Sequence, residues 1–298
     1  MPRVWRFRMK SGAPGVDHKA ARAFAFQDGW VGAGWGLGGT EWEDRIEDRS
    51  NDAALYLRGA QKVYPGDKSV ERALKIISEE ISAGDFCWAY ESSIGEYWCA
   101  KILGDFCYRQ GKSFNEFDWH ILRPCRWVRV GTADAVPGAI RRAFAGPFGT
   151  VSELKADKHR IVTAARLAFG DASIAPRNDL FEAAGPEDLE DLVAMYLQSQ
   201  GWFIYPSTAK ASMANYEFVM VNLLTGEKAG VQVKSGGIAQ LDLEISQEFD
   251  RFFVFLAGQN AKIEHNDRAS LITRETLLDF ARRKRHLLPE RLRNSWTD

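Results

Sequence analysis

The stretch from Tyr216 to Gly236, YEFVMVNLLTGEKAGVQVKSG, constrains the fold of this chain most strongly. Two apolar segments flank a Thr-Gly pair, which predicts two antiparallel strands joined by a tight turn. Three polar residues interrupt the apolar pattern: Glu217, Gln232 and Lys234. Because a buried strand seldom carries charge without a partner or a function, we expect these side chains to form a site.

The position of the turn decides which side chains meet. If the strands turn at the Thr-Gly pair, Glu217 lies directly opposite Lys234. Opposed residues of an antiparallel pair project to one side, and residues two apart in a strand share that side. This register predicts that Glu217, Gln232 and Lys234 cluster on one face, beside a helix that carries Glu190. A slip of one residue would separate them.

The chemistry of these three groups suits phosphodiester hydrolysis. Carboxylate and amide oxygens are hard ligands for Mg²⁺, which keeps several water molecules when a protein binds it. The ion activates water and offsets the charge of the phosphate, and a neighbouring lysine can stabilise the developing oxyanion. The cluster therefore predicts a metal-dependent site that uses Mg²⁺, with Mn²⁺ as a possible substitute. A purely structural ion pair between Glu217 and Lys234 is the alternative.

Residues 178–298 around this stretch predict a mixed sheet flanked by helices. Pro186 and Gly201 stand in favoured places for the start and the end of a helix. Between them apolar residues follow helical spacing, at Leu189, Leu192, Val193, Tyr196 and Leu197, and Glu190 lies at the edge of this stripe. The apolar run at 249–258 is typical of an interior strand, and 269–296 predicts a further strand and a last helix.

The segment from Leu189 to Gly236 resembles the PD-(D/E)xK nucleases, in the Mrr-like branch that carries QxK in place of ExK. The matching residues are LEDLV at 189–193, Glu217, and Gln232-Val233-Lys234. The resemblance implies a restriction-endonuclease-like fold with Glu217, Gln232, the Val233 carbonyl and an auxiliary Glu190 as metal ligands. It also implies Lys234 as the catalytic lysine, acting with Glu217 and Gln232. Most such enzymes carry Asp where this chain has Glu217.

Residues 1–130 predict a β-rich unit with helices. Strands are expected at 3–9, 85–92, 96–109 and 119–130, and amphipathic helices at 51–63 and 68–83, whereas 17–27 fits either type. The segment 28–39 is dense in glycine, which lets the backbone turn or approach a ligand closely. The two tryptophans of this segment, Trp30 and Trp35, are therefore candidates for an exposed loop wall.

This N-terminal half resembles the PUA-like superfamily, particularly its EVE and YTH branches. The residues that carry the likeness are GDFCWAYESSIGEYWCAKILGDF at 84–106 and the GxGW-like segment from Gly32 to Trp35. The resemblance implies a small β-barrel whose aromatic pocket holds an extruded, often methylated base. Trp30, Trp35 and Trp88 are the candidate pocket residues, with core tryptophans as the alternative for each.

Residues 131–177 are expected to form a helical linker, with a short helix after Pro137 and a longer helix at 152–169. Its basic character fits either a segment that lies along DNA or a solvated connector. A domain boundary is expected near Ala175, so the domains are 1–130, the linker 131–177, and 178–298. The fold class is α/β (α+β): a PUA-like barrel followed by a mixed sheet.

Composition narrows the cellular setting. The net charge of -1 argues against a nonspecific nucleic-acid coat, although acids outnumber bases after residue 178. No apolar run reaches the roughly 20 residues that span a bilayer, and the N-terminus has no apolar signal segment. Four cysteines without a CxxC pair fit reduced thiols, with a zinc site or disulfides as alternatives. We expect a cytoplasmic protein with no membrane partner.

Together these features predict a modification-dependent, type IV-like DNA endonuclease. One domain flips a modified base and the other cuts nearby, so double-stranded DNA is the expected partner and a homodimer is possible. The alternative is a non-catalytic protein that binds modified DNA or methylated RNA, since Glu217 replaces the usual Asp. Cleavage of modified DNA that depends on Mg²⁺ distinguishes the two.

Overall fold

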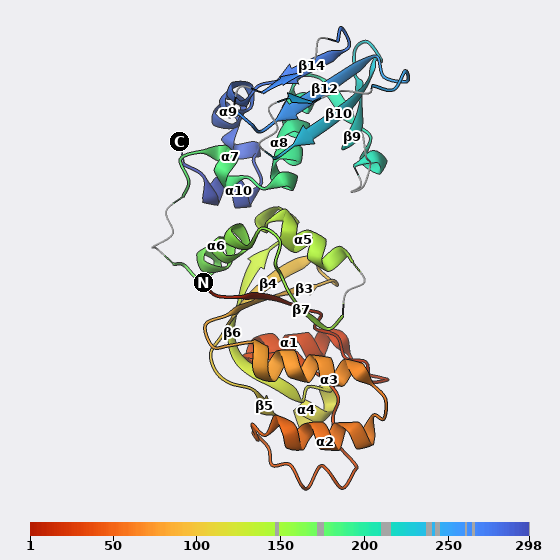
Figure 1. Ribbon diagram of the computed structural model, residues 1–298, viewed down its shortest axis with the longest axis vertical. Helices are drawn as coiled ribbons and strands as arrows, with labels where there is room; N and C mark the ends of the chain where they lie inside the picture. Colours follow the sequence, from red (N-terminus) through yellow and green to blue (C-terminus); the bar gives the residue numbers. More distant parts are fainter. Residues whose placement is uncertain are drawn as a thin grey trace. The chain divides into compact units, whose positions relative to one another are not determined.

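The structure is a computed structural model that describes residues 1–146, 149–171, 176–209, 216–236, 240–241, 245–259, 261–263 and 266–297. The chain forms two compact units, Met1–Ile174 and Ala175–Asp298. Both units combine helices with a sheet, so the predicted mixed α/β class is confirmed (Figure 1). None of the described helices has the length and apolar character needed to cross a membrane.

A curled seven-stranded sheet forms the centre of the first unit. Its order is β2-β6-β4-β3-β1-β7, with β5 paired to β6. The strands are β1 (Val4–Phe7), β2 (Trp30–Ala33), β3 (Phe86–Glu91), β4 (Glu96–Ile102), β5 (Cys107–Tyr108), β6 (Ile121–Gly131) and β7 (Val151–Glu153). The long β6 pairs with β2 and β5 in its first half and with β4 in its second half. One continuous strand thus connects β2 and β5 to the remaining strands of the sheet.

Helices cover both faces of this sheet (Figure 1). Trp5 and Cys87 point into a core shared with α1 (His18–Asp28), α2 (Ala53–Val63) and α3 (Lys68–Lys75), which continues as a π-helical turn over Ile76–Glu80. Their neighbours Val4 and Trp88 point to the other face, beneath α5 (Gly138–Ala145) and α6 (Lys158–Ala168). The short α4 (Lys112–Phe117) precedes β6. This alternation separates two cores within one unit.

The expected linker at 131–177 is instead part of the first unit in its described residues up to 171, whereas Arg177 pairs with Trp296 of the second unit. Val151–Glu153 pairs antiparallel with β1, so the start of the helix expected at 152–169 is a strand, and the helix begins at Lys158. Ile140 of α5 and Ile161 of α6 are fully buried against the sheet. The segment is integral because its apolar residues supply one of the two cores.

A five-stranded sheet of order β14-β12-β10-β9-β8 forms the centre of the second unit. The strands are β8 (Trp202–Ile204), β9 (Phe218–Asn222), β10 (Lys228–Lys234), β12 (Arg251–Leu256) and β14 (Ala269–Ile272). β10 lies between an antiparallel neighbour, β9, and a parallel neighbour, β12. Two further short strands, β11 (Gln240–Leu241) and β13 (Lys262–Ile263), pair with each other. The sheet is therefore mixed, as predicted.

The β9–β10 hairpin has a different register from the predicted one. Val231 pairs with Phe218, whereas the predicted register, with Glu217 opposite Lys234, differs by two residues. The turn is longer than a two-residue turn because Asn222 N donates to the Glu227 carbonyl at 2.9 Å. The Asn222 side chain also accepts hydrogen bonds from the amides of the turn. A shift of two residues keeps every side chain on its expected face.

Four helices lie along one face of this sheet (Figure 1): α7 (Leu180–Ala183), α8 (Pro186–Ser199), α9 (Arg274–Arg283) and α10 (Glu290–Ser295). Pro186 begins α8 as predicted, and the helix ends just before Gly201. Its predicted apolar stripe is confirmed at the buried Leu189, Leu192, Val193 and Leu197, which pack in one core with Val231 and Val233 of β10.

A buried ion pair anchors the first turn of α8. Asp188 accepts a hydrogen bond from Gly185 N at 2.8 Å and from the guanidinium of Arg291 on α10. Arg291 also donates to Asp191 at 2.5 Å. Burial lowers the pKa of Arg291, but the two carboxylates outweigh burial and raise this pKa above its ordinary value. The Arg291 side chain of α10 thus lies in the protein interior and connects this helix to the first turn of α8.

Replacing Arg291 by Met should destabilise the second unit. The substitution leaves the buried Asp188 carboxylate without this partner, which costs about 3–5 kcal/mol for a buried pair. Urea unfolding of the full chain measures the change. Arg293→Met on the same helix is the control, because Arg293 is exposed and its loss should change stability by less than about 0.5 kcal/mol. Equal effects of the two substitutions would contradict the anchoring role of Arg291.

Candidate functional site

Glu217, Gln232 and Lys234 lie on the face of the second sheet that is opposite α8. Val231 and Val233 point into the core beneath the helices. The intervening Gln232 and Lys234 therefore project to the other face. On that face Val219 of β9 belongs to a separate apolar core with Val254 and Leu256 of β12. Apolar and polar side chains alternate along β10, so its valines pack beneath the helices and its polar residues form the candidate site on the other face.

The structure brings Glu217 and Lys234 together. The Lys234 Nζ lies 3.9 Å from the Glu217 Oε1, and the two side chains are 31% and 23% exposed. Glu217 N donates to the Val231 carbonyl at 2.7 Å, which holds the start of β9 against β10. Gln232 precedes Lys234 by two residues in β10 and is buried. The distance of 3.9 Å exceeds that of a hydrogen bond, so the pair is held by charge alone.

Partial burial raises the pKa of Glu217 above its ordinary value, because desolvation outweighs the opposing effect of Lys234. An ionised Glu217 therefore needs more positive charge than one lysine at 3.9 Å provides. A divalent cation bound to this carboxylate would supply that charge and lower the pKa. The 3.9 Å separation and the raised pKa of Glu217 together describe a weak ion pair that leaves the burial of the carboxylate uncompensated.

Glu190 occupies a different position from the other predicted ligands. It lies on α8, and the apolar stripe of this helix packs against Val231 and Val233. Glu217, Gln232 and Lys234 project from the opposite face of the sheet. The expectation that the three side chains cluster beside the α8 helix is therefore wrong. Strand alternation is the reason, since one face of β10 cannot carry both the helix core and the polar residues.

The groups that fit Mg²⁺ are the Glu217 carboxylate, the Gln232 amide oxygen and the Val233 carbonyl. In the described parts of the chain, no three His, Cys, Asp or Glu side chains are placed to hold a metal ion. A single carboxylate with neutral oxygen donors suits Mg²⁺, which retains water molecules in sites with few protein ligands. The four cysteines are free thiols, so neither a disulfide nor a cysteine zinc site is formed.

Substituting Glu217 by Gln should reveal the energetic cost of this carboxylate. The folded pKa lies above the ordinary value of 4.5, so ionised Glu217 destabilises the fold at neutral pH. This cost falls away as the pH drops below the ordinary pKa. In metal-free buffer we expect Glu217→Gln to be more stable than the parent near pH 7 and equally stable near pH 4, measured by urea unfolding.

The matched control is Glu248→Gln, at an exposed carboxylate that pairs with Lys228 in the same unit. This substitution should cause no gain of stability near pH 7. A Glu217→Gln chain that is less stable than the parent near pH 7 would instead show that attraction to Lys234 exceeds the cost of burial.

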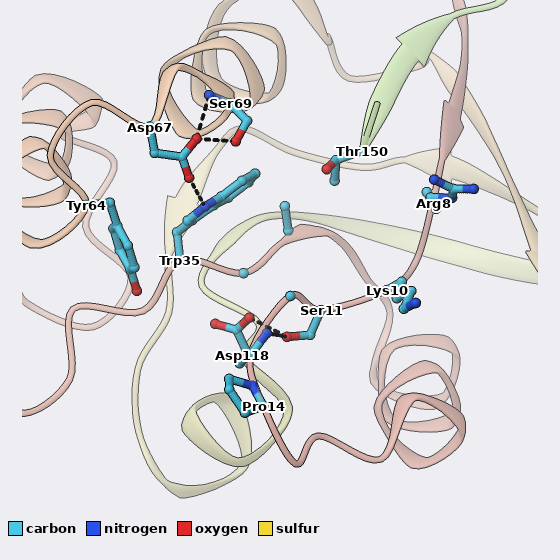
Figure 2. A pocket seen from close by; sticks show the side chains of 14 residues that line it. Arg8, Lys10, Ser11, Pro14, Trp35, Tyr64, Asp67, Ser69, Asp118 and Thr150 are labelled. Carbon is cyan, nitrogen blue, oxygen red and sulfur yellow. Dashed lines mark hydrogen bonds between the residues drawn. The ribbon is translucent and has the colours of Figure 1, made fainter. Parts of the chain in front are cut away.

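The first unit contains a cavity of about 690 Å³, within the range of about 300–1,000 Å³ of small-molecule sites. Figure 2 shows the ring of Trp35 on one side and Arg8 and Lys10 on the opposite side, with Asp118 and Ser11 below Trp35 in this view. One wall is thus aromatic, one carries positive charge, and a third carries a carboxylate. This combination of surfaces suits a flat, polar ligand.

Trp35 is held in place by hydrogen bonds to its ring and to its backbone. Its φ of 64° lies in the left-handed region, which is unusual for a residue other than glycine. Tyr56 donates to the Trp35 carbonyl at 2.7 Å, and the indole Nε1 donates to Asp67 at 3.1 Å. Hydrogen bonds from Ser69 and Trp35 lower the pKa of Asp67. Backbone strain of this kind is typical of functional sites, where the surrounding contacts maintain it.

Glycines allow the polypeptide to pass close to the carboxylate in the cavity. A Cβ added to Gly34 would lie 2.1 Å from the Asp118 Oδ2, and one added to Gly36 would lie 2.4 Å from the His120 Nε2. Gly34 and Gly36 thus allow close approach between segments of the protein, whereas the sequence suggested close approach to a ligand.

Only one of the three predicted base-binding tryptophans lines the cavity. Trp88 is completely buried in the core beneath α5 and α6, on the other face of the sheet. Trp30 contacts the Arg109 guanidinium at 4.8 Å and the Phe114 ring at 6.1 Å, outside the lining of the cavity. The expectation that Trp30 and Trp88 form a cage with Trp35 is therefore wrong for this cavity, and strand alternation excludes Trp88.

Several residues that line the cavity were not identified from the sequence: Arg8, Lys10, Ser11, Tyr64, Asp67 and Asp118. They come from three separated segments, so no local motif connects them. The turn-forming run SGAPG at 11–15 was the one available signal for a loop near a site.

Comparison of the chain with protein-family models, with curated proteins and with solved structures finds no match. The resemblances to PD-(D/E)xK nucleases and to PUA-like domains therefore stay predictions. They rest on the sequence motifs of this chain alone.

Proposed function

We propose that this protein is a modification-dependent DNA endonuclease. Its second unit hydrolyses phosphodiester bonds with Mg²⁺ or Mn²⁺, and its first unit holds a modified base that has been flipped out of the duplex. Double-stranded DNA is the substrate, and two copies of the chain would cut both strands, since each copy supplies one hydrolytic site.

The observation that carries the proposal is the pairing of Glu217 with Lys234 at 3.9 Å, on the same sheet face as Gln232. A carboxylate, an amide and an ammonium group there match the ligand and charge requirements of metal-assisted phosphodiester hydrolysis. The raised pKa of Glu217 supports the same function, because among the described residues the one cation that lowers this pKa, Lys234, does not offset the burial of the carboxylate.

Each residue has a distinct role in the proposed reaction. Glu217 and Gln232 would hold the metal ion with the Val233 carbonyl, and the ion would supply Lewis-acid activation of water and of the phosphate. Lys234 places its ammonium beside the reacting phosphate and stabilises the negative charge that grows on its oxygens. Partial burial of Glu217 and Lys234 strengthens these interactions, since charges act over a lower local dielectric than in water.

The cavity of the first unit supports the base-reading part of the proposal. A flipped base that stacks on one aromatic side chain gains about 1–3 kcal/mol. Trp35 offers that surface in a fixed orientation, so little conformational entropy is lost when a ligand binds. A modified or mispaired base also costs less to extrude than an ordinary base pair, which contributes to selectivity.

Substituting Lys234 by Ala should abolish most of the cleavage. Loss of one group that stabilises the transition-state charge lowers rates by about 100- to 1,000-fold. The measurement is digestion of modified and unmodified duplexes with Mg²⁺ or Mn²⁺. We expect the parent chain to cut modified DNA only, and Lys234→Ala to bind the same DNA without cutting it.

Lys228→Ala is the matched control, because Lys228 begins the same strand and faces the same side. Six residues separate the two lysines, about 20 Å along the strand, so cleavage should survive in the control. Unchanged cleavage by Lys234→Ala would refute the nuclease assignment. Binding of modified DNA by the parent without cleavage under either metal would instead support a non-catalytic reader.

A further inference from the structure

The cavity of the first unit presents an acceptor to its ligand. The Asp118 side chain is 14% exposed and accepts a hydrogen bond from the Ser11 hydroxyl at 2.5 Å. Its second oxygen, Oδ1, lies 3.4 Å from the Gly36 amide nitrogen and 3.7 Å from the His120 Nε2. An ionised carboxylate has about four acceptor positions on its two oxygens, so these three neighbours leave acceptor capacity.

The position of this carboxylate is fixed before a ligand arrives. Asp118 has a φ of 51°, in the left-handed region, directly after α4. Gly34 lies so close that any side chain there would meet the Asp118 carboxylate. The Ser11 hydroxyl is committed to Asp118 as donor, and its oxygen accepts from Ala13 N at 2.9 Å. A fixed, acceptor-only group discriminates strongly between ligand edges that carry donors and edges that carry oxygens.

Charge is distributed across the cavity in a pattern that matches a nucleotide. Arg8 and Lys10 are exposed on the side opposite Trp35, and Asp118 lies below Trp35 beside Ser11 (Figure 2). A phosphate would lie near the two cations, and a flat ring on Trp35 would direct its polar edge toward Asp118. A carboxylate accepts from exocyclic amino groups such as the cytosine N4 amine. The edge of thymine or uracil has one N–H between two oxygens, which Asp118 repels.

We propose that this cavity selects nucleobases that carry an exocyclic amino group, and rejects thymine and uracil derivatives, through Asp118. The inference rests on the proposed base-reading function and specifies its substrate class. Ser11 acts as a positioning residue that aligns the carboxylate. Trp35 accepts any flat ring and therefore contributes affinity without this selectivity.

The test compares 5-hydroxymethylcytosine with 5-hydroxymethyluracil, each opposite guanine in the same duplex. The two bases differ only on the base-pairing edge, where cytosine has an amino group and an unprotonated N3 and uracil has an oxygen and an N3–H. Fluorescence anisotropy with the full chain in metal-free buffer measures binding without cleavage. A duplex with N6-methyladenine and an unmodified duplex complete the panel. The uracil derivative forms a mismatch that is easier to flip, so a preference for the amino bases opposes that bias.

We expect the tightest binding to an amino-bearing modified base, by about 10- to 100-fold over 5-hydroxymethyluracil, as for loss of a hydrogen bond to a charged group. Asp118→Asn should remove most of this ratio, since the amide presents a donor as well as an acceptor. Asparagine tolerates the left-handed backbone, so the fold should survive. Asp28→Asn, at an exposed carboxylate that ends α1, is the matched control and should keep the ratio.

Ser11→Ala is the second variant, and it should lower the ratio several-fold without removing the carboxylate. It keeps the test decisive if Asp118→Asn fails to fold. Tightest binding to 5-hydroxymethyluracil, or an unchanged ratio in the folded variants, would overturn the inference while the base-reading function stands. Failure of the chain to bind any modified duplex better than the unmodified one would overturn both the inference and the reading function.

Discussion

The alternation of side chains along β10 is the constraint on which the second unit depends. Val231 and Val233 complete the core beneath the helices, while Gln232 and Lys234 project from the other face. Any change of register by one residue would place a lysine in the core and a valine in the site. Packing of the two valines therefore fixes the positions of Gln232 and Lys234. Because β10 is a central strand, the candidate site lies on a rigid element.

The same constraint explains why Glu217 is energetically unsatisfied. It stands at the start of β9, where pairing with β10 fixes its position beside Lys234. The protein holds the two charges 3.9 Å apart without a hydrogen bond between them, and burial raises the pKa of Glu217. A structural pair would gain from closer contact, whereas a metal site requires a carboxylate that is still available.

The cavity of the first unit also holds its functional candidates in fixed positions. Its cavity is built around a strained tryptophan and a carboxylate, both in left-handed backbone conformations. Tyr56, Asp67 and Ser11 hold these two residues through hydrogen bonds. The resulting cavity has an aromatic wall, an acceptor and two cations, and all of them are positioned without a ligand. Preorganisation of this kind favours selectivity between similar ligands.

The sequence by itself determined the elements with strong local signals and the faces of β10. The apolar stripe of α8, its start at Pro186 and the shared face of Gln232 and Lys234 were all predictable, because helical and strand periods are properties of neighbouring residues. The pairing register was not, since a four-residue turn replaced the expected two-residue turn and moved the partners by two.

Only the tertiary structure decided which distant segments meet. It placed α8 on the opposite face from Glu217, made residues 138–168 part of the first unit, and put Trp88 in a core away from Trp35. It also assembled the cavity from residues as far apart as Arg8 and Asp118. Local periodicity shows which side of an element is buried. It carries no information on what covers that side, which depends on long-range packing of complementary apolar surfaces.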